Sequence, residues 1–212
     1  MNAARAIARF AEARVSVVSS GEAALLLQVS LNAASKLMQR LSAAGAVTKL
    51  CRGLWGVSPT IDPYELPEHL VAPFPAYVSL HSALHLHGMV EQIPPVIYCV
   101  TLGRTRRITT SLGTYSFHRV DARFFDGFDV VGERGVKLAT PEKALADLCY
   151  LASTRLRLFS SLPELTLPRG FSSRRATAWL ARVQNPKLQQ AALDRLNAHL
   201  HTAAAAQTSA SG

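Results

Sequence analysis

Residues 20–58 read SGEAALLLQVSLNAASKLMQRLSAAGAVTKLCRGLWGVS. The stretch predicts a helix over 21–29, a tight turn over 29–31, a second helix and a two-stranded hairpin. The hydroxyl of Ser30 can accept a hydrogen bond from a first-turn amide of the second helix, and Gly45 can adopt the left-handed conformation that ends a helix. Between them a 3.6-residue period places apolar side chains on one face: Leu31, Ala34, Leu37, Met38, Leu41 and Ala44.

The opposite face of the second helix is polar and carries no acidic residue. Amide, hydroxyl and basic side chains of this kind can hydrogen-bond base edges or phosphates. A helix that is apolar on one side and amide-plus-basic on the other suits a major groove. The predicted contacts are Asn32, Ser35, Lys36, Gln39 and Arg40.

The hairpin consists of strands over 46–51 and 54–57, with Arg52-Gly53 as its turn. Its basic tip, Lys49 and Arg52, would meet the sugar-phosphate backbone. Helix, turn, helix and hairpin together predict a winged helix-turn-helix that binds DNA. The alternative is a small helical subdomain with a capping hairpin that binds no DNA.

Charge is unevenly distributed along the 212 residues, which total +9 with a pI near 10.0. Residues 1–60 contain seven Lys and Arg against two acids, whereas 61–100 contain four acids and no Lys or Arg. Basic residues dominate again in 101–123 and 155–187. Segregated basic charge points to a polyanionic partner.

Cysteine usage and hydropathy indicate a cytoplasmic protein. Cys51, Cys99 and Cys149 are odd in number, widely spaced and without ligand spacing, which predicts reduced, half-buried thiols. The first ten residues lack the pattern of a signal peptide, and no apolar run approaches the roughly 20 residues of a membrane span.

Four segments are expected: a winged helix-turn-helix over 1–58, a proline-rich connector over 59–75, an α/β domain over 76–201 and a disordered tail over 202–212. A helix over 3–14 and a short strand over 15–18 precede the two helices of the helix-turn-helix. Five prolines predict an extended connector with one short turn near 64–70. The fold class is α+β, with a mixed sheet and packed helices in the C-terminal domain.

The C-terminal domain is predicted to begin with a helix over 77–88 that has Ser79 as its N-cap. Strands follow over 96–101, 106–111, 114–120, 128–131 and 136–139. Thr140 and Pro141 then start a helix that runs to residue 151. After a loop over 162–168, helices are expected over 172–183 and 186–201.

Several residue groups invite catalytic or metal interpretations that their spacing disfavours. His81 and His85 lie at i, i+4 on one helix, but Ser82 stands where a metalloprotease needs Glu, so neither metal nor cofactor is expected. Ser79 and Ser82 lack a G-x-S-x-G turn. Glu142 and Lys143 are explained by helix-start chemistry, and no enzyme activity is expected.

Two further basic groups can either contact nucleic acid or a partner, or simply face solvent. The first lies in the turn from residue 103 to 107, which lacks the G-x-x-x-x-G-K-[ST] spacing of a phosphate loop. It comprises Arg104, Arg106 and Arg107. The second comprises Arg155, Arg157, Arg174 and Arg175.

The order of motifs resembles that of the AbiEi-type antitoxins of type IV toxin–antitoxin systems, which are associated with abortive phage infection. The chain has R-G-L-W-G-V at 52–57, Y-V-S-L-H-S-A-L-H-L-H-G-M-V-E-Q-I-P at 77–94, Y-S-F-H at 115–118 and A-T-P-E-K-A-L-A-D-L at 139–148. The resemblance covers residues 5–195. Its most specific stretches are 77–94 and 138–151.

The resemblance implies an antitoxin that counteracts a nucleotidyltransferase-like toxin encoded by the neighbouring gene. It also implies repression of the shared promoter through cooperative binding to inverted repeats, with self-association on DNA. The C-terminal domain would carry antitoxicity, without a stable complex with the toxin being required. Two other functions remain open: a protein-interaction module or a regulator without antitoxin activity.

Overall fold

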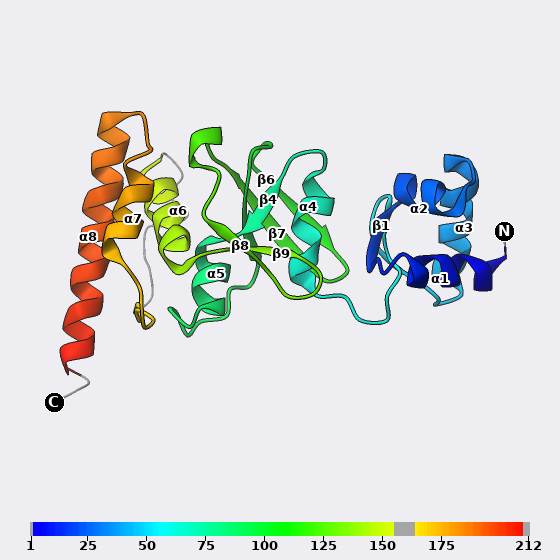
Figure 1. The fold of residues 1–212 in the computed structure, drawn as a ribbon, viewed down its shortest axis with the longest axis horizontal. Helices are drawn as coiled ribbons and strands as arrows, with labels where there is room; N and C mark the ends of the chain where they lie inside the picture. The colour runs from blue at the N-terminus through cyan, green and yellow to red at the C-terminus, as the bar shows by residue number, and fades with distance from the viewer. Residues whose placement is uncertain (1, 155–163, 210–212) are drawn as a thin grey trace. The chain divides into compact units, whose positions relative to one another are not determined.

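The computed structural model describes residues 2–154 and 164–209 (Figure 1). The chain divides into two compact units. The N-terminal unit comprises Met1–Pro73 and Arg107–Thr114, and the C-terminal unit comprises Phe74–Arg106 and the chain from Tyr115 onward. The boundary at Pro73 falls inside the expected connector. The inclusion of residues 107–114 in the N-terminal unit could not be read from local sequence, because the association is long-range.

The N-terminal unit combines short helices with a three-stranded antiparallel sheet in the order β1-β3-β2. β1 pairs with strand β3 of the hairpin. Ser19 and Glu22 form a capping box that starts α2, and Ser30 caps α3. The elements are α1 (Ala3–Glu12), β1 (Val17–Ser19), α2 (Ser20–Leu27), α3 (Leu31–Ala43), β2 (Thr48–Cys51) and β3 (Leu54–Gly56).

The core of this unit is built on the apolar faces of α1, α2 and α3. Ala34, Leu37, Met38 and Leu41 are buried, as the helical period predicts. Leu31 is 56% exposed and Ala44 is also exposed, so the predicted apolar face is shorter than expected. Leu31 is the first residue of α3 and Ala44 is its C-cap, so both lie at the ends of the helix.

The connector contains more helix than the sequence indicated. A 3-10 helix, η1 (Pro63–Glu65), leads directly into α4 (Leu66–Val71). Asp62 caps η1 by accepting a hydrogen bond from the Tyr64 amide. Prolines at 63 and 67 stand at the first turns of these helices, where a missing N–H costs nothing, so they start helices instead of preventing them.

A six-stranded mixed sheet has the order β6-β7-β5-β4-β9-β8, and its strands belong to the C-terminal unit except for residues 107–114 of β6, the turn and the start of β7. β4 runs antiparallel to β5 and parallel to β9, β5 runs parallel to β7, and β8 runs antiparallel to β9. The strands are β4 (Ala76–Val78), β5 (Ile97–Thr101), β6 (Arg106–Thr110), β7 (Gly113–Arg119), β8 (Phe128–Val131) and β9 (Val136–Ala139). A second 3-10 helix, η2 (Ala122–Phe124), follows β7.

The predicted helix over 77–88 is wrong at its start. Tyr77 and Val78 lie in β4, and the helix α5 spans only Leu80–Leu86. The three residues of β4 are fully buried between β5 and β9, and this long-range pairing overrides the helical spacing of the apolar residues. Ser79 occupies the N-cap position, and its carbonyl accepts from the Ala83 amide at 3.2 Å, but its hydroxyl makes no capping hydrogen bond to α5.

Three helices gather at one side of the sheet in the C-terminal unit: α6 (Pro141–Ser153), α7 (Ser173–Leu180) and α8 (Pro186–Ser209). α6 packs against α5, α7 and α8 (Figure 1). α8 continues past His201, so residues 202–209 of the expected disordered tail are helical. This segment is rich in alanine, which has a high helix propensity, and Ala203 is buried, so both local preference and packing favour the longer helix.

Candidate nucleic-acid interface and a buried polar cluster

Helix α3 presents one polar, non-acidic face to solvent. Asn32, Lys36, Gln39 and Arg40 are exposed, and their spacing of three and four residues places them on one side of the helix. Ser35 is half-buried at the edge of this face. The structure therefore brings together the five residues that the sequence singled out on this helix.

The turn of the β2–β3 hairpin is fixed to the start of α2. Gly53 has a φ of +77°, and its carbonyl accepts a hydrogen bond of 2.9 Å from the Ser20 amide. The indole N–H of Trp55 on β3 donates to the Ser20 hydroxyl at 3.0 Å. Lys49 and Arg52 are both exposed on this hairpin. These contacts hold the basic hairpin within the same unit as α3.

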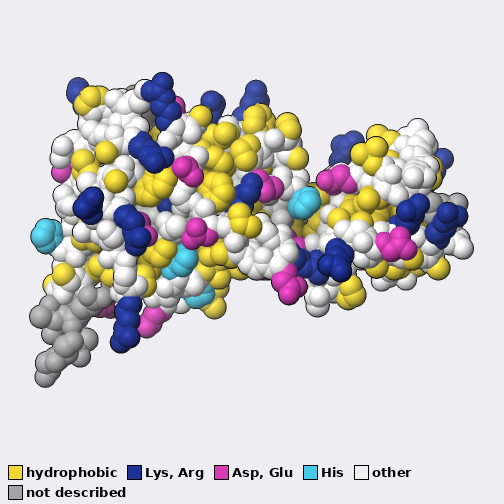
Figure 2. All heavy atoms as spheres, viewed as in Figure 1, with side chains coloured by type: hydrophobic (Ala, Val, Ile, Leu, Met, Phe, Trp, Pro, Cys, Tyr) yellow, Lys and Arg dark blue, Asp and Glu magenta, His cyan; other side chains and the backbone are white. Residues whose placement is uncertain are grey.

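The other predicted basic residues differ in their surroundings. Arg104, Arg106 and Arg107 are exposed, but Arg107 belongs to the N-terminal unit and the other two to the C-terminal unit. Arg174 is exposed, whereas Arg175 donates to Glu142 Oε1 at 2.7 Å and to the Gly170 carbonyl at 2.9 Å. Arg155 and Arg157 lie outside the described residues. Figure 2 shows basic side chains on the visible face of each unit, interspersed with acidic ones.

The histidines near α5 contact the backbone. His85 Nδ1 lies 3.3 Å from the Val90 carbonyl, and His87 Nε2 lies 2.7 Å from the Ala139 carbonyl. His81 lies against the Tyr98 ring. Within residues 2–154 and 164–209, no three His, Cys, Asp or Glu side chains are arranged to hold a metal ion.

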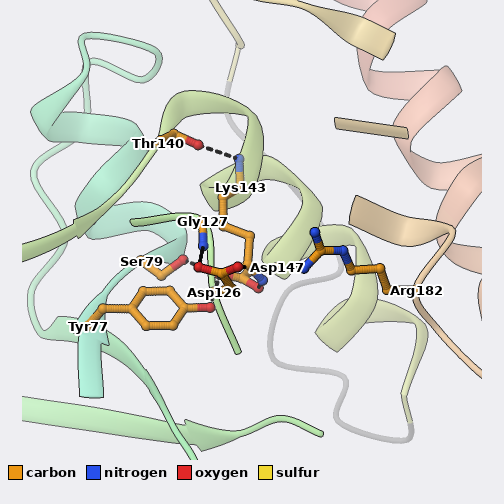
Figure 3. Close-up of polar contacts among 8 residues, drawn as sticks. All are labelled: Tyr77, Ser79, Asp126, Gly127, Thr140, Lys143, Asp147 and Arg182. Carbon is orange, nitrogen blue, oxygen red and sulfur yellow. Dashed lines mark hydrogen bonds and ion pairs between the residues drawn. The ribbon is translucent and has the colours of Figure 1, made fainter. Parts of the chain in front are cut away.

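A cluster of four buried polar residues joins β4 to α6 in the C-terminal unit. The hydroxyl groups of Tyr77 and Ser79 point toward Asp147 (Figure 3) and donate to its Oδ2 at 2.9 and 2.7 Å. The ammonium group of Lys143 donates to Oδ1 of the same carboxylate. All four side chains are fully buried, and we call them the Asp147 cluster. In this conformation no solute can reach any of its members.

Aromatic rings complete the surroundings of Lys143. Its Nζ atom lies 3.7 Å from the ring centroid of Phe124 and 5.2 Å from that of Trp179. Burial lowers the pKa of Lys143 and raises the pKa of Asp147, because both charged forms lose hydration, although each partner opposes the shift of the other. The ring faces and the carboxylate replace the water that the ammonium has lost.

Trp179 and Gly127 separate Lys143 from the surface. A Cβ atom on Gly127 would lie 2.4 Å from Trp179 Cζ2 and 3.0 Å from Lys143 Cγ, so only glycine allows both side chains to approach. The guanidinium of Arg182 lies 4.0 Å from the Trp179 ring centroid and 3.7 Å from Asp126. This ion pair is exposed, and Arg182 lies over the indole ring.

The backbone beside Ser79 is strained. Leu80 has a φ of +54°, an unfavourable region for a branched residue, and it is fully buried. β4 and β9 are parallel neighbours, so Ser79 and the start of α6 meet at the same sheet edge. The hydrogen bond from the Ser79 hydroxyl to Asp147 ties this turn to α6, and the Asp147 cluster offsets the cost of the strained backbone.

Sequence reasoning missed the Asp147 cluster, although one signal was available. Lys143 and Asp147 lie four residues apart, within the stripe of α6 that also contains Ala144, Leu148 and Leu151. Opposite charges at i, i+4 inside an apolar stripe indicate a buried ion pair. The sequence gives no such signal for Tyr77 and Ser79, because it places both in a helix, whereas Tyr77 lies in β4 and Ser79 directly precedes α5.

Comparison with known proteins does not identify a relative. Neither the search against models of protein families nor the search against curated proteins returned a match. Among the described residues, none of the helices combines the length and hydropathy needed to cross a bilayer.

Proposed function

We propose that this chain is a DNA-binding transcriptional regulator whose N-terminal unit acts as a winged helix-turn-helix. The observation that carries the proposal is the exposed face of α3, where Asn32, Lys36, Gln39 and Arg40 share one side and no carboxylate intervenes. α3 would enter the major groove, with its amide side chains facing base edges. Lys49 and Arg52 on the neighbouring hairpin would contact phosphates.

The arrangement around α3 supports this function. α2 and α3 are joined by a turn in which Gln28 has a φ of +54°, and Ser30 starts α3 by accepting from the Ala33 amide at 3.3 Å. Strands β2 and β3 follow α3 in the chain, carry the basic turn between them and form a three-stranded sheet with β1. A net charge of +9 would attract the protein to any polyanion, and the amide side chains of α3 would add sequence preference.

We further propose, from the resemblance to AbiEi-type antitoxins, that the chain represses its own operon and counteracts a nucleotidyltransferase-like toxin. Self-association on inverted repeats would make the binding cooperative. Coexpression with the neighbouring gene tests the antitoxin role: the toxin should arrest growth alone, and this chain should restore growth. Continued arrest at equal expression would leave a regulator without antitoxin activity.

Fluorescence anisotropy tests DNA binding directly. The full chain is titrated onto the duplex upstream of its gene and onto a scrambled duplex, each at several salt concentrations. We expect preference for the upstream duplex and a steep decrease of affinity with salt. Equal, weak binding to both duplexes would contradict the regulator and favour a protein-interaction module.

A double variant tests the α3 assignment. Lys36→Ala with Arg40→Ala should weaken binding to the upstream duplex and reduce the salt slope by about two, because each phosphate contact contributes roughly 0.9. The matched control is Arg5→Ala with Arg9→Ala on α1, which removes the same charge from the same unit. An equal loss in both double variants would show that charge alone, and not α3, determines the affinity.

A further inference from the structure

A groove of about 580 Å³ lies between α7 and α8 in the C-terminal unit. α7 contributes Ser173, Arg174 and Thr177 to its lining, and α8 contributes Asn197, Leu200 and His201. Each set follows helical spacing, with intervals of one, three and four residues, so it forms one face of its helix. Each helix therefore presents polar side chains to the same space, whose volume lies in the usual range for small-molecule sites.

The polar lining of this groove consists only of neutral and basic side chains. Two hydroxyls, an amide, a guanidinium and an imidazole can all donate hydrogen bonds, and no carboxylate is present among the lining residues. Arg174 is exposed and makes no ion pair with another described residue. The groove thus offers hydrogen-bond donors and a positive charge, with no acidic side chain in its lining.

An apolar surface completes the groove. Leu167, Phe171 and Leu200 line it and are half-buried. Their side chains can exclude water from an organic group but offer nothing to a fully hydrated ion. A ligand that uses the whole groove must therefore combine an anionic group with an apolar part.

A second pocket on the same unit shows the contrast. It has a volume of about 420 Å³ and is lined by Arg169 and Arg175, but also by Asp129 and Glu142. Arg175 is already bound to Glu142 at 2.7 Å. Charges in this pocket balance, whereas those of the groove between α7 and α8 do not, so the groove is the better site for an anion.

We propose that the groove between α7 and α8 binds a phosphate monoester whose organic part is apolar or aromatic. A phosphate group has three terminal oxygens that accept strong hydrogen bonds, and it needs several donors from different directions. Ser173, Arg174 and Thr177 from one wall and Asn197 from the other provide them. The organic group would rest on Phe171 and Leu200.

Isothermal titration calorimetry of the full chain tests this proposal with phenyl phosphate as the probe. Inorganic phosphate lacks the apolar part, and phenol lacks the anion. We expect phenyl phosphate to bind at least tenfold more tightly than either. Equal binding of inorganic phosphate would exclude a role for the apolar surface, and equal binding of phenol would exclude an anion site.

Two variants locate the bound probe. Arg174→Ala should weaken phenyl phosphate binding at least tenfold, and Thr177→Val should weaken it by a smaller factor. Lys187→Ala is the matched control, because it removes one exposed positive charge from α8 outside the groove. Circular dichroism confirms that each variant is folded. If Arg174→Ala and Lys187→Ala bind the probe equally, the site is elsewhere and the proposal is wrong.

Discussion

Lys143 and Asp147 lie one turn apart on α6 and form an ion pair whose side chains are both 0% exposed. The carboxylate also accepts hydrogen bonds from Tyr77 and Ser79, so the pair connects α6 to β4 and to the turn that follows it. Removing one partner leaves the other charge buried without compensation. Removing one partner is therefore expected to lower the free energy of unfolding by more than the intact pair adds to it.

Replacing Lys143 with Met should destabilise the protein by about 3–5 kcal/mol, because Asp147 then loses its buried counter-charge. The double variant Lys143→Met with Asp147→Leu should be more stable than Lys143→Met alone, since no charge remains buried. Asp147→Leu alone completes the cycle, and urea denaturation gives the four free energies of unfolding, including that of the unchanged protein. Additive effects of the two substitutions would show that the ion pair carries no coupling.

Features that depend on residues close in the chain could be predicted from the sequence. Ser30 and Thr140 were identified as N-caps from local chemistry, and both accept a hydrogen bond from the amide three residues on. Strands β8 and β9 were predicted with the bounds that the structure has. These features depend on residues close in the chain, which is why a local pattern is enough.

Long-range contacts account for the errors. Tyr77 was assigned to a helix because its segment has helical spacing, yet β4 forms through pairing with β5 and β9. The hydrogen bond from Ser79 to Asp147 joins residues 68 positions apart, and no spacing rule relates them. The five residues predicted on α3 were found together because one helix carries them all.

Replacing Gly127 with Ala should destabilise the C-terminal unit more than a positive φ alone explains. A methyl group there would lie 2.4 Å from Trp179 Cζ2, and Gly127 has a φ of +80°. We expect a loss of about 1 kcal/mol from the backbone and more from the displaced indole. Changes in Trp179 fluorescence should accompany the loss.

Gly132→Ala is the matched control for this prediction. Gly132 has a φ of +69°, but a methyl group would meet no atom within 4 Å. It should therefore cost only about 1 kcal/mol and leave Trp179 fluorescence unchanged. Equal losses in the two variants would show that Trp179 moves freely and does not cover Lys143.

Stability should decrease as the pH falls from about 6.5 to about 4. Burial lowers the pKa of His118 from its ordinary value of 6.5 to about 4, and its Nε2 atom lies 3.0 Å from the Ser116 hydroxyl. In this window the unfolded chain binds a proton that the folded chain does not. The stability that the neutral His118 contributes is therefore fully present above pH 6.5 and is lost progressively as the pH falls to about 4. The total amounts to at most about 3 kcal/mol.

Urea denaturation of His118→Gln across this pH range tests the assignment. The variant lacks the titrating imidazole, so its stability should depend less on pH than that of the unchanged protein. Burial also lowers the pKa values of His81 and His199, and they account for a residual slope of the same sign. His201→Gln, which changes an exposed histidine, should keep the full slope. A parallel curve for His118→Gln would assign the dependence to other groups.

Two single substitutions should separate the contributions of α3 and the hairpin to the proposed DNA binding. Gln39→Ala on α3 should reduce affinity for the upstream duplex by about 1–3 kcal/mol and leave the scrambled duplex and the salt slope unaffected, because an amide contacts bases without displacing counterions. Arg52→Ala in the hairpin turn should weaken both duplexes alike and lower the salt slope by about one. Anisotropy titrations of both variants on both duplexes measure the difference. If Arg52→Ala changes sequence preference while Gln39→Ala does not, the hairpin and not α3 lies against the bases.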